Sequence, residues 1–532
     1  MKVLKSFFAA AACLMAFAAC EPEQQNGGGT SGAAVTVVTD DVMNVSYAGD
    51  DEMLIEFMCS GSWSASVVYS SADEDWITFS GETEGTGNGS LTFEVAANDG
   101  KVARSAVIKI VSGENVAEVT VSQEFMKLNI SFRHPSLLYT NEQLAKIKAA
   151  MKTPEGTATS LKDAAGYIIL RADTGFEYDV ETVTTANKQL NNDNTTWYKH
   201  VSGPALLAMH HALAWGICED DSTNKAKYAQ KAVEILMSWA NACKDVEYPV
   251  GTEGTDEEPS TGAGMYLARG LFPFFVVYDI LMDTEYISAE QDAVIRGWFT
   301  NVVTHIKASM NAWDNNDYFN KQYYQNHLCA HMWGLLSIGY LLEDPSLVQF
   351  AIDHEDNPRD FYELIQGTIF MEGDTPCHRE AATAPAPKTG EIYDRYRHDT
   401  GPLKGLQYTS LTLQCLSSAA RVCKNNGIDM YAYTAPTGEN LKLAYEFYAP
   451  FYTQMKSDLE HGYYAGEDDR ITKAGDMRGL FELGYNAYPE STKIKAVLDA
   501  MPNRGNNAKA DRQMHDQLSY TRLLSVDVDS VN

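Results

Sequence analysis

Between about residues 34 and 125, short β-prone apolar runs alternate with clusters of Gly, Asn, Asp and Ser. The runs are Val35–Val38, Met53–Phe57, Leu91–Val95 and Ala106–Ile110. Strands of this length at this spacing are typical of a β-sandwich. We therefore predict a small all-β domain over residues 34–125.

From about residue 130 onward the pattern of apolar residues becomes helical. Leu206–Ile217 and Met332–Leu342 are almost uniformly apolar, whereas Tyr228–Ala242 carries its apolar residues on one helical face. Uniformly apolar helices are buried on most sides. Apolar and amphipathic helices that alternate and are joined by long loops predict helical hairpins wound into an (α/α) toroid. We assign residues 130–532 to this all-α domain.

Two capping boxes support the helical assignment. Thr140 to Gln143 precedes a helix over Leu144–Met151, and Ser288 to Gln291 precedes one over Ala293–Met310. Strand signals are scarce in this region and the sequence has no glycine-rich phosphate loop. An α/β architecture of the Rossmann or barrel type is therefore disfavoured.

The N-terminus has the pattern of an export signal. Lys2 and Lys5 precede an apolar stretch over Phe7–Ala19, which is too short to cross a bilayer as a mature helix. Small residues before Cys20 resemble a lipobox, so we predict a lipoprotein signal peptide over residues 1–20 with Cys20 lipidated. An ordinary signal peptide with a chance cysteine is the alternative.

The residues after the signal predict a flexible linker and a cellular location. Residues 21–33 are rich in Gly and polar residues and read as a flexible linker. Their acidic start is similar to the surface-export signal of lipoproteins in Bacteroides-type bacteria. We expect an outer-membrane lipoprotein at the cell surface or in the periplasm, in contact with the membrane only through its lipid. No later apolar run is expected to be long enough for a transmembrane helix.

Charge and cysteine content narrow the functional classes. A net charge of −31 argues against nucleic acid as a partner. A polyanionic substrate would need a locally basic cleft. Two of the nine cysteines belong to the signal and lipid sites, and the remaining odd number, without a CxxC pair, argues against a disulfide framework or a cysteine zinc site. We expect no metal and no cofactor.

The chemistry of uronic-acid polymers suggests a function. A base can remove the C5 proton, which lies α to the carboxylate, and the C4–O bond then breaks without water. This proton is too weakly acidic unless the carboxylate charge is neutralised. The site therefore needs amide, imidazole or guanidinium donors, a base near C5, and an acid for the leaving oxygen.

Two segments supply these residue types. Residues 323–327 (Tyr-Tyr-Gln-Asn-His) lie where a loop enters a strongly apolar helix, with the polar pair facing away from the core. Residues 395–398 (Arg-Tyr-Arg-His), with Lys404 and Tyr408 after them, form a basic cluster in an acidic chain. The alternatives are that Asn326 only caps its helix beside an exposed His327, and that the basic cluster only answers nearby acidic residues.

Other residues are candidate sugar contacts or core residues. Aromatic rings next to Lys and His in polar loops suit stacking on sugars. These rings could instead pack beneath the toroid, and the paired histidines inside an apolar helix are better explained as core. The loop candidates are Trp197, Tyr198, Lys199, His200, Trp313 and Tyr318, and the core histidines are His210 and His211.

The β-domain resembles a BACON domain, the immunoglobulin-like module common in Bacteroides carbohydrate enzymes. Residues 76–81 (Trp-Ile-Thr-Phe-Ser-Gly), 97–99, 103–106 and 119–123 carry the likeness. We interpret the domain as a spacer. Its tryptophans, Trp63 and Trp76, fit the sandwich core better than a sugar platform.

The helical domain resembles the alginate-lyase superfamily of polysaccharide lyases over residues 132–460. The motifs that carry the likeness are His134–Leu138, Ala229–Ala240, Asn326–His327, Leu406–Leu411 and Gly427–Tyr431. The resemblance implies that Asn326 contacts the substrate carboxylate, that His327 supplies a base, and that Tyr408 is the catalytic tyrosine. It also implies a polyuronate substrate, alginate first and glucuronan next. The expected substrate contacts are Arg395, Arg397, His398, Lys404, Trp197, Tyr198, Lys199, His200 and Tyr324.

One position departs from the family pattern. Alginate lyases of polysaccharide lyase family five place an arginine seven residues before the tyrosine, where this chain has Gly401. Arg395, Arg397 or Lys404 could replace it. Tyr393 and Tyr396 are second choices for the catalytic tyrosine.

Two other functions compete with the lyase. A glycoside hydrolase on a helical toroid would need paired carboxylates, for which Glu372, Asp374 and Glu380 are candidates. A non-catalytic glycan-binding lipoprotein would use the β-domain and the aromatic loops. It would leave Asn326 and His327 without a role.

Overall fold

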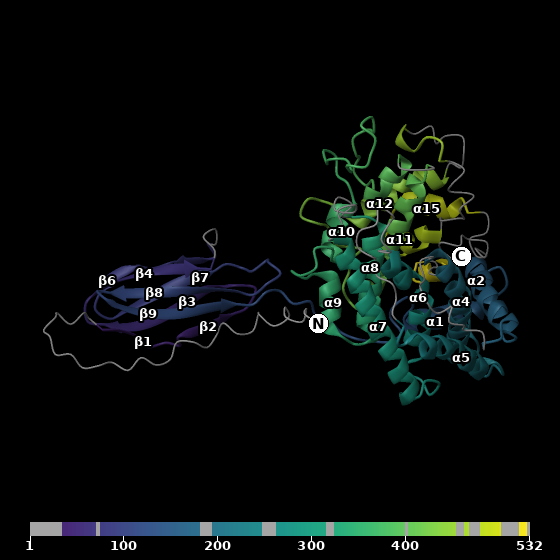
Figure 1. The fold of residues 1–532 in the computed structure, drawn as a ribbon, viewed down its shortest axis with the longest axis horizontal. Coiled ribbons are helices and arrows are strands. Elements are labelled where there is room, and N and C mark those ends of the chain that lie inside the picture. The colour runs from purple at the N-terminus through teal and green to yellow at the C-terminus, as the bar shows by residue number, and fades with distance from the viewer. Residues whose placement is uncertain are drawn as a thin grey trace, which may run out of the picture. The chain divides into compact units, whose positions relative to one another are not determined.

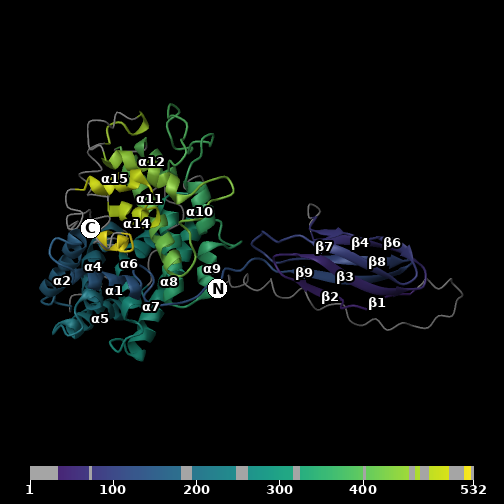
Figure 2. The ribbon, with the colours of Figure 1, turned by 180° about the vertical axis from the view of Figure 1, so that it is seen from behind.

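The computed structural model describes residues 34–70, 75–180, 194–246, 262–314, 324–399, 403–453, 462–467, 479–501 and 521–528 (Figures 1 and 2). The chain divides into two compact units, residues 1–126 and 127–532. Cys20, Tyr318 and Gly401 lie outside the described residues, as does the side chain of Lys199.

The first unit is a sandwich of two sheets. One sheet has the order β1-β3-β7-β5, and the other has the order β2-β9-β8-β4-β6. Neighbouring strands are antiparallel except β2 and β9, which pair in parallel with Val42 opposite Thr120. The strands are β1 (Val35–Val37), β2 (Val42–Val45), β3 (Asp50–Cys59), β4 (Ser62–Tyr69), β5 (Ile77–Phe79), β6 (Glu84–Thr86), β7 (Gly89–Val95), β8 (Arg104–Ser112) and β9 (Asn115–Gln123).

Alternate residues of the strands fill the space between these sheets. In β7, Leu91, Phe93 and Val95 are buried and their neighbours are exposed. Trp63 and Trp76 are also buried, and the ring of Trp63 meets Phe57 edge-on at 4.8 Å between centroids. The predicted sandwich is confirmed, and its tryptophans belong to the core instead of a sugar-binding face.

The second unit is helical. The helices are α1 (Asn141–Met151), α2 (Thr159–Thr174), α4 (Asn194–Ile217), α5 (Lys225–Cys243), α6 (Gly262–Leu281), α7 (Ala289–Asp314), α8 (Asn326–Leu341), α9 (Pro345–Ile352), α10 (Phe361–Thr368), α11 (Gly405–Asn425), α12 (Leu441–Thr453), α14 (Leu480–Ala487) and α15 (Thr492–Asp499). The 3-10 helices are η1 (Tyr393–His398), η2 (Gly462–Tyr464) and η4 (Thr521–Ser525).

The most apolar helices form the centre of this unit. Helix α4 packs against α6, α6 against α8, and α8 against α11. Helix α5 packs on α4 and α7 packs on α6. Nearly every residue of α8 is buried, in agreement with its uniformly apolar sequence.

Both predicted capping boxes are present. The Thr140 hydroxyl accepts from the Gln143 amide N–H while the Gln143 side chain accepts from the Thr140 N–H. Ser288 and Gln291 make the same pair of bonds ahead of α7. The sequence therefore placed these two helix starts within three or four residues.

Asp279 on α6 fixes the segment that opens the helical unit. Its carboxylate accepts from the backbone N–H groups of Ser136 and Leu137 at 2.7 Å each, and lies 2.8 Å from His134 Nδ1. A buried carboxylate with three partners holds this segment against α6. The hydrogen bonds to Asp279 thus explain why the motif His134–Leu138 opens the helical unit.

Helix α6 corrects one expectation from the sequence. Ala263–Leu281 is long and apolar enough to cross a membrane by length and composition, although we expected no such run after the signal. Of the residues in this apolar stretch, 94% are buried inside the unit, where the helix contacts α4, α7 and α8. Its apolar character is explained by this central position.

Candidate active site

Asn326 begins α8 and is almost completely buried. Its backbone N–H donates to Asp394 Oδ2 at 2.8 Å, and its side-chain amide donates to Asp394 Oδ1 at 3.0 Å. Asp394 also accepts from the Thr412 hydroxyl on α11 at 2.6 Å. One buried carboxylate on η1 therefore connects the start of α8 to the first turns of α11.

His327 follows on the same turn and is partly exposed. Its Nδ1 atom is buried and has no hydrogen-bond partner among the described residues. The ring lies beside Trp313 at the end of α7, with 4.7 Å between centroids. This corrects the expectation that Trp313 is an exposed loop residue, because it is buried against the imidazole.

Desolvation determines the charge of His327. Burial lowers the pKa of its imidazole well below the ordinary value. The neighbouring His331, together with the positive charges of Arg397 and Arg269, lowers this pKa further. His327 is therefore neutral at pH 7 and able to accept a proton.

The guanidinium of Arg397 lies over the ring of Tyr408, and its charge acts on His327. The guanidinium of Arg397, on η1, lies 4.7 Å from the ring centre of Tyr408, which is on the first turn of α11. It also lies 5.1 Å from the ring of Tyr396. Arg397 therefore lies against the ring of Tyr408 and near enough to His327 for its positive charge to lower the pKa of that imidazole.

Arg395 has a different environment from Arg397. Its side chain is fully buried and donates to Glu380 Oε2 at 2.6 Å and to Glu391. A third bond runs to the carbonyl of Pro385. Both carboxylates come from the loop before η1. This placement corrects the expectation of a substrate contact, because the charge of Arg395 is already neutralised inside the protein.

His398 and Lys404 stand at the two ends of the segment before α11. His398 Nδ1 lies 2.7 Å from Glu467 Oε1. Lys404 precedes α11, where its carbonyl accepts from the Tyr408 N–H at 3.0 Å and its own N–H donates to the Arg397 carbonyl. Both side chains remain partly exposed, so they stay available as substrate contacts.

The predicted aromatic loop at residues 197–200 is instead part of helix α4. Trp197 is buried and lies against the backbone of Gly270 on α6, so it cannot stack on a sugar. His200 is exposed, and Tyr198 is partly buried. The loop prediction was wrong because polar residues at the start of an otherwise apolar helix look like a loop in the sequence.

Arg269 was missed by the sequence analysis. It lies on α6, is 5% exposed, and its guanidinium lies 5.3 Å from the ring centre of Tyr198. Its Nη2 atom donates to the Tyr198 hydroxyl at 3.5 Å. A single arginine in the middle of an apolar helix was the available signal, since buried arginine is rare without a partner or a function.

Tyr324 and the alternative tyrosines form a separate cluster with Phe370 and Cys377. Tyr324 is partly buried, and the guanidinium of Arg359 lies 5.0 Å from its ring centre. Tyr393 and Tyr396 are buried, and burial raises the pKa of each phenol far above its ordinary value. Tyr408 is the more accessible of the candidate catalytic tyrosines.

The carboxylates suggested for a hydrolase do not form a free pair. Glu380 is held by Arg395, and its side chain is 1% exposed. Asp374 lies on an exposed loop, where it accepts from the backbone N–H of Met371. Glu372 is also exposed on that loop. This arrangement lacks two carboxylates that face one bond.

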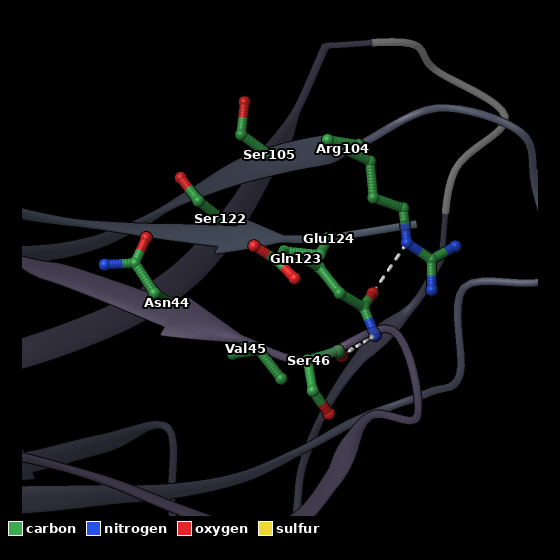
Figure 3. A pocket seen from close by; sticks show the side chains of 9 residues that line it. Asn44, Val45, Ser46, Arg104, Ser105, Ser122, Gln123 and Glu124 are labelled. Atoms are coloured by element: carbon green, nitrogen blue, oxygen red, sulfur yellow. Dashed lines mark hydrogen bonds between the residues drawn. The ribbon is translucent and has the colours of Figure 1, made fainter. Parts of the chain in front are cut away.

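The β-unit contains a hollow of about 460 Å³ between β2, β8 and β9 (Figure 3). Arg104 in this hollow donates to Gln123 Oε1 and to the carbonyls of Ala96 and Ala97. Gln123 in turn donates to the carbonyl of Ser46. These groups fasten the end of the sheet, and their hydrogen bonds are made inside the protein.

Metal ligands do not gather in the described part of the chain. No group of three or more His, Cys, Asp or Glu side chains there could hold a metal ion. His210 and His211 are buried in α4, as expected of core histidines, and burial lowers the pKa of His211 to about 4. Cys218, Cys329 and Cys415 are likewise buried and free.

Comparison with known proteins agrees with this architecture. Residues 62–124 match the BACON family, described as a putative N-terminal binding domain, and residues 181–458 match the alginate lyase family. An alginate lyase from Bacteroides ovatus has a similar fold, with a TM-score of 0.51 and 14% identity over 73% of this chain and 99% of that one. No curated protein matches the sequence.

A second set of solved structures comes from one enzyme. Alginate lyase A1-III from Sphingomonas species A1 has a TM-score of 0.44 and 16% identity over 68% of this chain and 93% of that one. A variant of A1-III complexed with a tetrasaccharide has a TM-score of 0.45 and 16% identity over 68% of this chain and 88% of that one.

The second unit is an (α/α) toroid, as the sequence predicted. The match to the alginate lyase family makes this protein a polysaccharide lyase. The family match covers more than half of the 532 residues. The chain belongs to the alginate lyase family.

Proposed function

We propose that the helical unit cleaves a polyuronate, alginate first and glucuronan next, by β-elimination at the site formed by His327, Arg397 and Tyr408. The observation that carries this proposal is the arrangement around Asp394. This carboxylate joins Asn326 on α8 to Thr412 on α11. Arg397, whose charge acts on both Asp394 and His327, lies over the ring of Tyr408, so we infer that His327, Arg397 and Tyr408 act at one site.

Arg397 is our choice for the arginine that neutralises the substrate carboxylate. Arg395 is unsuitable because Glu380 and Glu391 already hold it. Arg269 adds a second positive charge close enough to lower the pKa of His327. Two guanidinium groups near His327 supply local positive charge in a chain of net charge −31, as a polyanionic substrate requires.

Asn326 has a positioning role in this proposal. Its amide N–H groups face Asp394 Oδ1 and Gln325 Oε1 inside the protein. It therefore fixes the start of α8, and with it the orientation of His327. Arg397 and Arg269 therefore provide most of the stabilisation of the developing aci-anion.

In the reaction, neutral His327 removes the C5 proton of the uronate as a general base. The electron pair forms the C4–C5 double bond, and the C4–O bond breaks. The Tyr408 hydroxyl donates its proton to the leaving oxygen. His398, Lys404, Tyr198 and Tyr324 then remain as candidate contacts to neighbouring sugars.

The experiment is to incubate the protein with alginate, glucuronan and glycosaminoglycans and to follow ultraviolet absorbance and reducing ends together. β-Elimination produces one unsaturated, ultraviolet-absorbing end for each bond cleaved. Reducing ends without new absorbance would instead indicate hydrolysis. A variant of A1-III was crystallised with a tetrasaccharide, which supports an oligosaccharide ligand for this site.

We also propose that the protein is exported and anchored to the outer membrane through a lipid on Cys20. The charged, apolar and small-residue order of residues 1–20 supports this proposal. The measurement is incorporation of labelled palmitate, compared between the wild type and Cys20→Ser. Equal labelling of the two proteins would refute lipidation at Cys20.

A further inference from the structure

Glu467 joins the two segments that carry Arg397 and Tyr408. Its Oε1 atom accepts from the Gly405 N–H at 2.8 Å and lies 2.7 Å from His398 Nδ1. Its Oε2 atom accepts from the Leu406 N–H at 2.7 Å. The residue is completely buried. Both carboxylate oxygens are therefore used, and all their partners lie on the two segments.

On each of the two segments, the partner of Glu467 lies next to a residue with a proposed role in the reaction. His398 directly follows Arg397 on η1. Gly405 and Leu406 are the first residues of α11, and Tyr408 lies on the same turn. The residues between these segments include 400–402, outside the described part of the chain. The carboxylate of Glu467 thus bridges the two ends of this connection.

Helix α11 depends on this carboxylate at its start. Lys404 at the N-cap makes no side-chain hydrogen bond to the helix. The first N–H groups of a helix need acceptors, and a negative charge there is favourable. Glu467 provides both from a segment distant in sequence. A Cβ atom on Gly405 would lie 3.0 Å from Glu467 Oε1, so glycine allows this close approach.

The rest of the segment around Glu467 contacts the same elements. The Tyr463 hydroxyl donates to Asp399 Oδ2 at 2.6 Å. The Tyr464 hydroxyl lies 2.9 Å from the Tyr448 hydroxyl, and Tyr448 in turn accepts from the Ile392 N–H. Residues 463–467 are therefore fastened to the residues on either side of η1, directly at Asp399 and through Tyr448 at Ile392.

We propose that Glu467 is a positioning residue for the lyase reaction. By holding His398 and the first turn of α11, Glu467 sets the distance between Arg397 and Tyr408. The inference rests on the proposed function for the roles of Arg397 and Tyr408. It goes beyond the family match, which ends at residue 458. Glu467 contacts no reacting atom in this scheme and acts through the residues it holds.

The test compares Glu467→Gln with Glu482→Gln in the full chain. Glutamine places an N–H donor where an acceptor is needed, so at least one of the three hydrogen bonds is lost. Glu482, on α14, is the matched control. It is also completely buried, and its carboxylate accepts a hydrogen bond from the Ser525 hydroxyl at 2.6 Å. Each variant is assayed at the same folded fraction, measured by thermal unfolding.

We expect Glu467→Gln to lower kcat roughly tenfold to a hundredfold, because a displaced Tyr408 is a poor proton donor. KM should rise less than kcat falls, since His327 and Arg269 lie on other helices and only the η1 contacts to substrate shift with Arg397 and His398. Glu482→Gln should keep the wild-type kcat. A wild-type kcat for Glu467→Gln, or equal losses in both variants, would overturn the proposal.

A milder pair of variants tests the same connection. His398→Asn keeps an N–H donor near the position of Nδ1, whereas His398→Leu removes it. We expect the asparagine variant to retain more of kcat than the leucine variant. Equal losses would mean that His398 acts only through direct contact with substrate, and that Glu467 does not position the site through it.

Hydrogen exchange separates this inference from the proposed function. If the wild type cleaves no polyuronate, the lyase assignment fails, while the structural clamp is still measurable. In that case, exchange of the amides in residues 403–410 should be faster in Glu467→Gln and unchanged in Glu482→Gln. Unchanged exchange in both variants would refute the clamp itself.

Discussion

The two units differ in how they treat buried polar groups. In the described part of the β-unit the buried polar residues are neutral: Asn98, Ser112 and Gln123. Each donates to backbone carbonyls, as Asn98 does to Val102 and Glu124. The helical unit instead buries charged residues, and several surround the starts of α8 and α11. These include Arg269, Glu391, Asp394, Arg395 and Glu467.

This difference separates a scaffold from a reaction site. Burying a charge is costly unless it is paired and hydrogen-bonded, so a fold that needs only stability avoids it. A site that stabilises a developing anion needs charges in a water-poor environment, where they act strongly. Not every buried charge does this, since Arg395 is neutralised by two carboxylates. Arg397 and Arg269 are the charged residues that lower the pKa of His327.

The largest effect should come from the residues that move protons. His327→Ala and Tyr408→Phe should each lower turnover by about 10²- to 10⁴-fold, because a general base or acid contributes that much. Ultraviolet assays on the preferred polyuronate measure this loss, and circular dichroism checks the fold. Turnover near the wild-type rate in either variant would remove that residue from the mechanism.

The two neighbouring arginines should differ in kind. Arg395→Met should lower the free energy of unfolding by about 3–5 kcal/mol, because Glu380 and Glu391 would lose their buried partner. Arg397→Met should lower it by less than this, because Arg397 is partly exposed, although its positive charge favours the ionised form of the buried Asp394. If both variants lose stability equally, the distinction between a structural and a functional arginine is wrong.

Removing one of the functional guanidinium groups should also shift the pH profile. Arg397→Met should lower kcat/KM by roughly a hundredfold. It should also raise the pKa of His327, since the positive charge of Arg397 lowers this pKa now. The acid limb of kcat/KM then moves to higher pH. A profile of unchanged shape would contradict the influence of the Arg397 charge on His327.

His331 should affect stability instead of catalysis. Burial lowers its pKa to about 3, so between pH 6.5 and about 3 the unfolded chain binds a proton that the folded chain does not. Folded stability from this residue is therefore lost as the pH falls through that range. As the pH falls through this range, the free energy of unfolding of His331→Leu should rise relative to that of the wild type by about 1.4 kcal/mol per pH unit. Urea unfolding at a series of pH values measures this difference.

The smallest effect should follow from removing the β-unit. A chain that begins at Lys127 should keep kcat/KM on a soluble polyuronate within about twofold, because the site residues all lie in the second unit. The matched measurement uses the full chain at the same concentration. A large loss of activity would show that the β-unit contributes to substrate binding.

Periodicity was sufficient to predict most of the elements, while residue chemistry and the family resemblance supplied the candidate site. The β-runs, the two capping boxes and the uniformly apolar stretch of α8 follow from local rules, which neighbouring residues satisfy among themselves. Asn326, His327 and Tyr408 were recognisable because they lie at the starts of two long helices. Residues 197–200 were misread as a loop, since only packing of α4 against α6 shows that Trp197 is buried.

The sequence by itself determined that a β-sandwich precedes a helical toroid, and which segments hold the amide, imidazole and phenol groups. Only the tertiary structure decided that Arg395 is held by two buried carboxylates while the nearly adjacent Arg397 is partly exposed beside Tyr408. It also decided that Arg269 lies near enough to His327 to lower its pKa and that Glu467 contacts His398. The physical reason is that periodicity depends on residues a few positions apart. The charge state and orientation of a side chain depend on partners brought close by folding, such as Glu380 for Arg395 and Glu467 for His398.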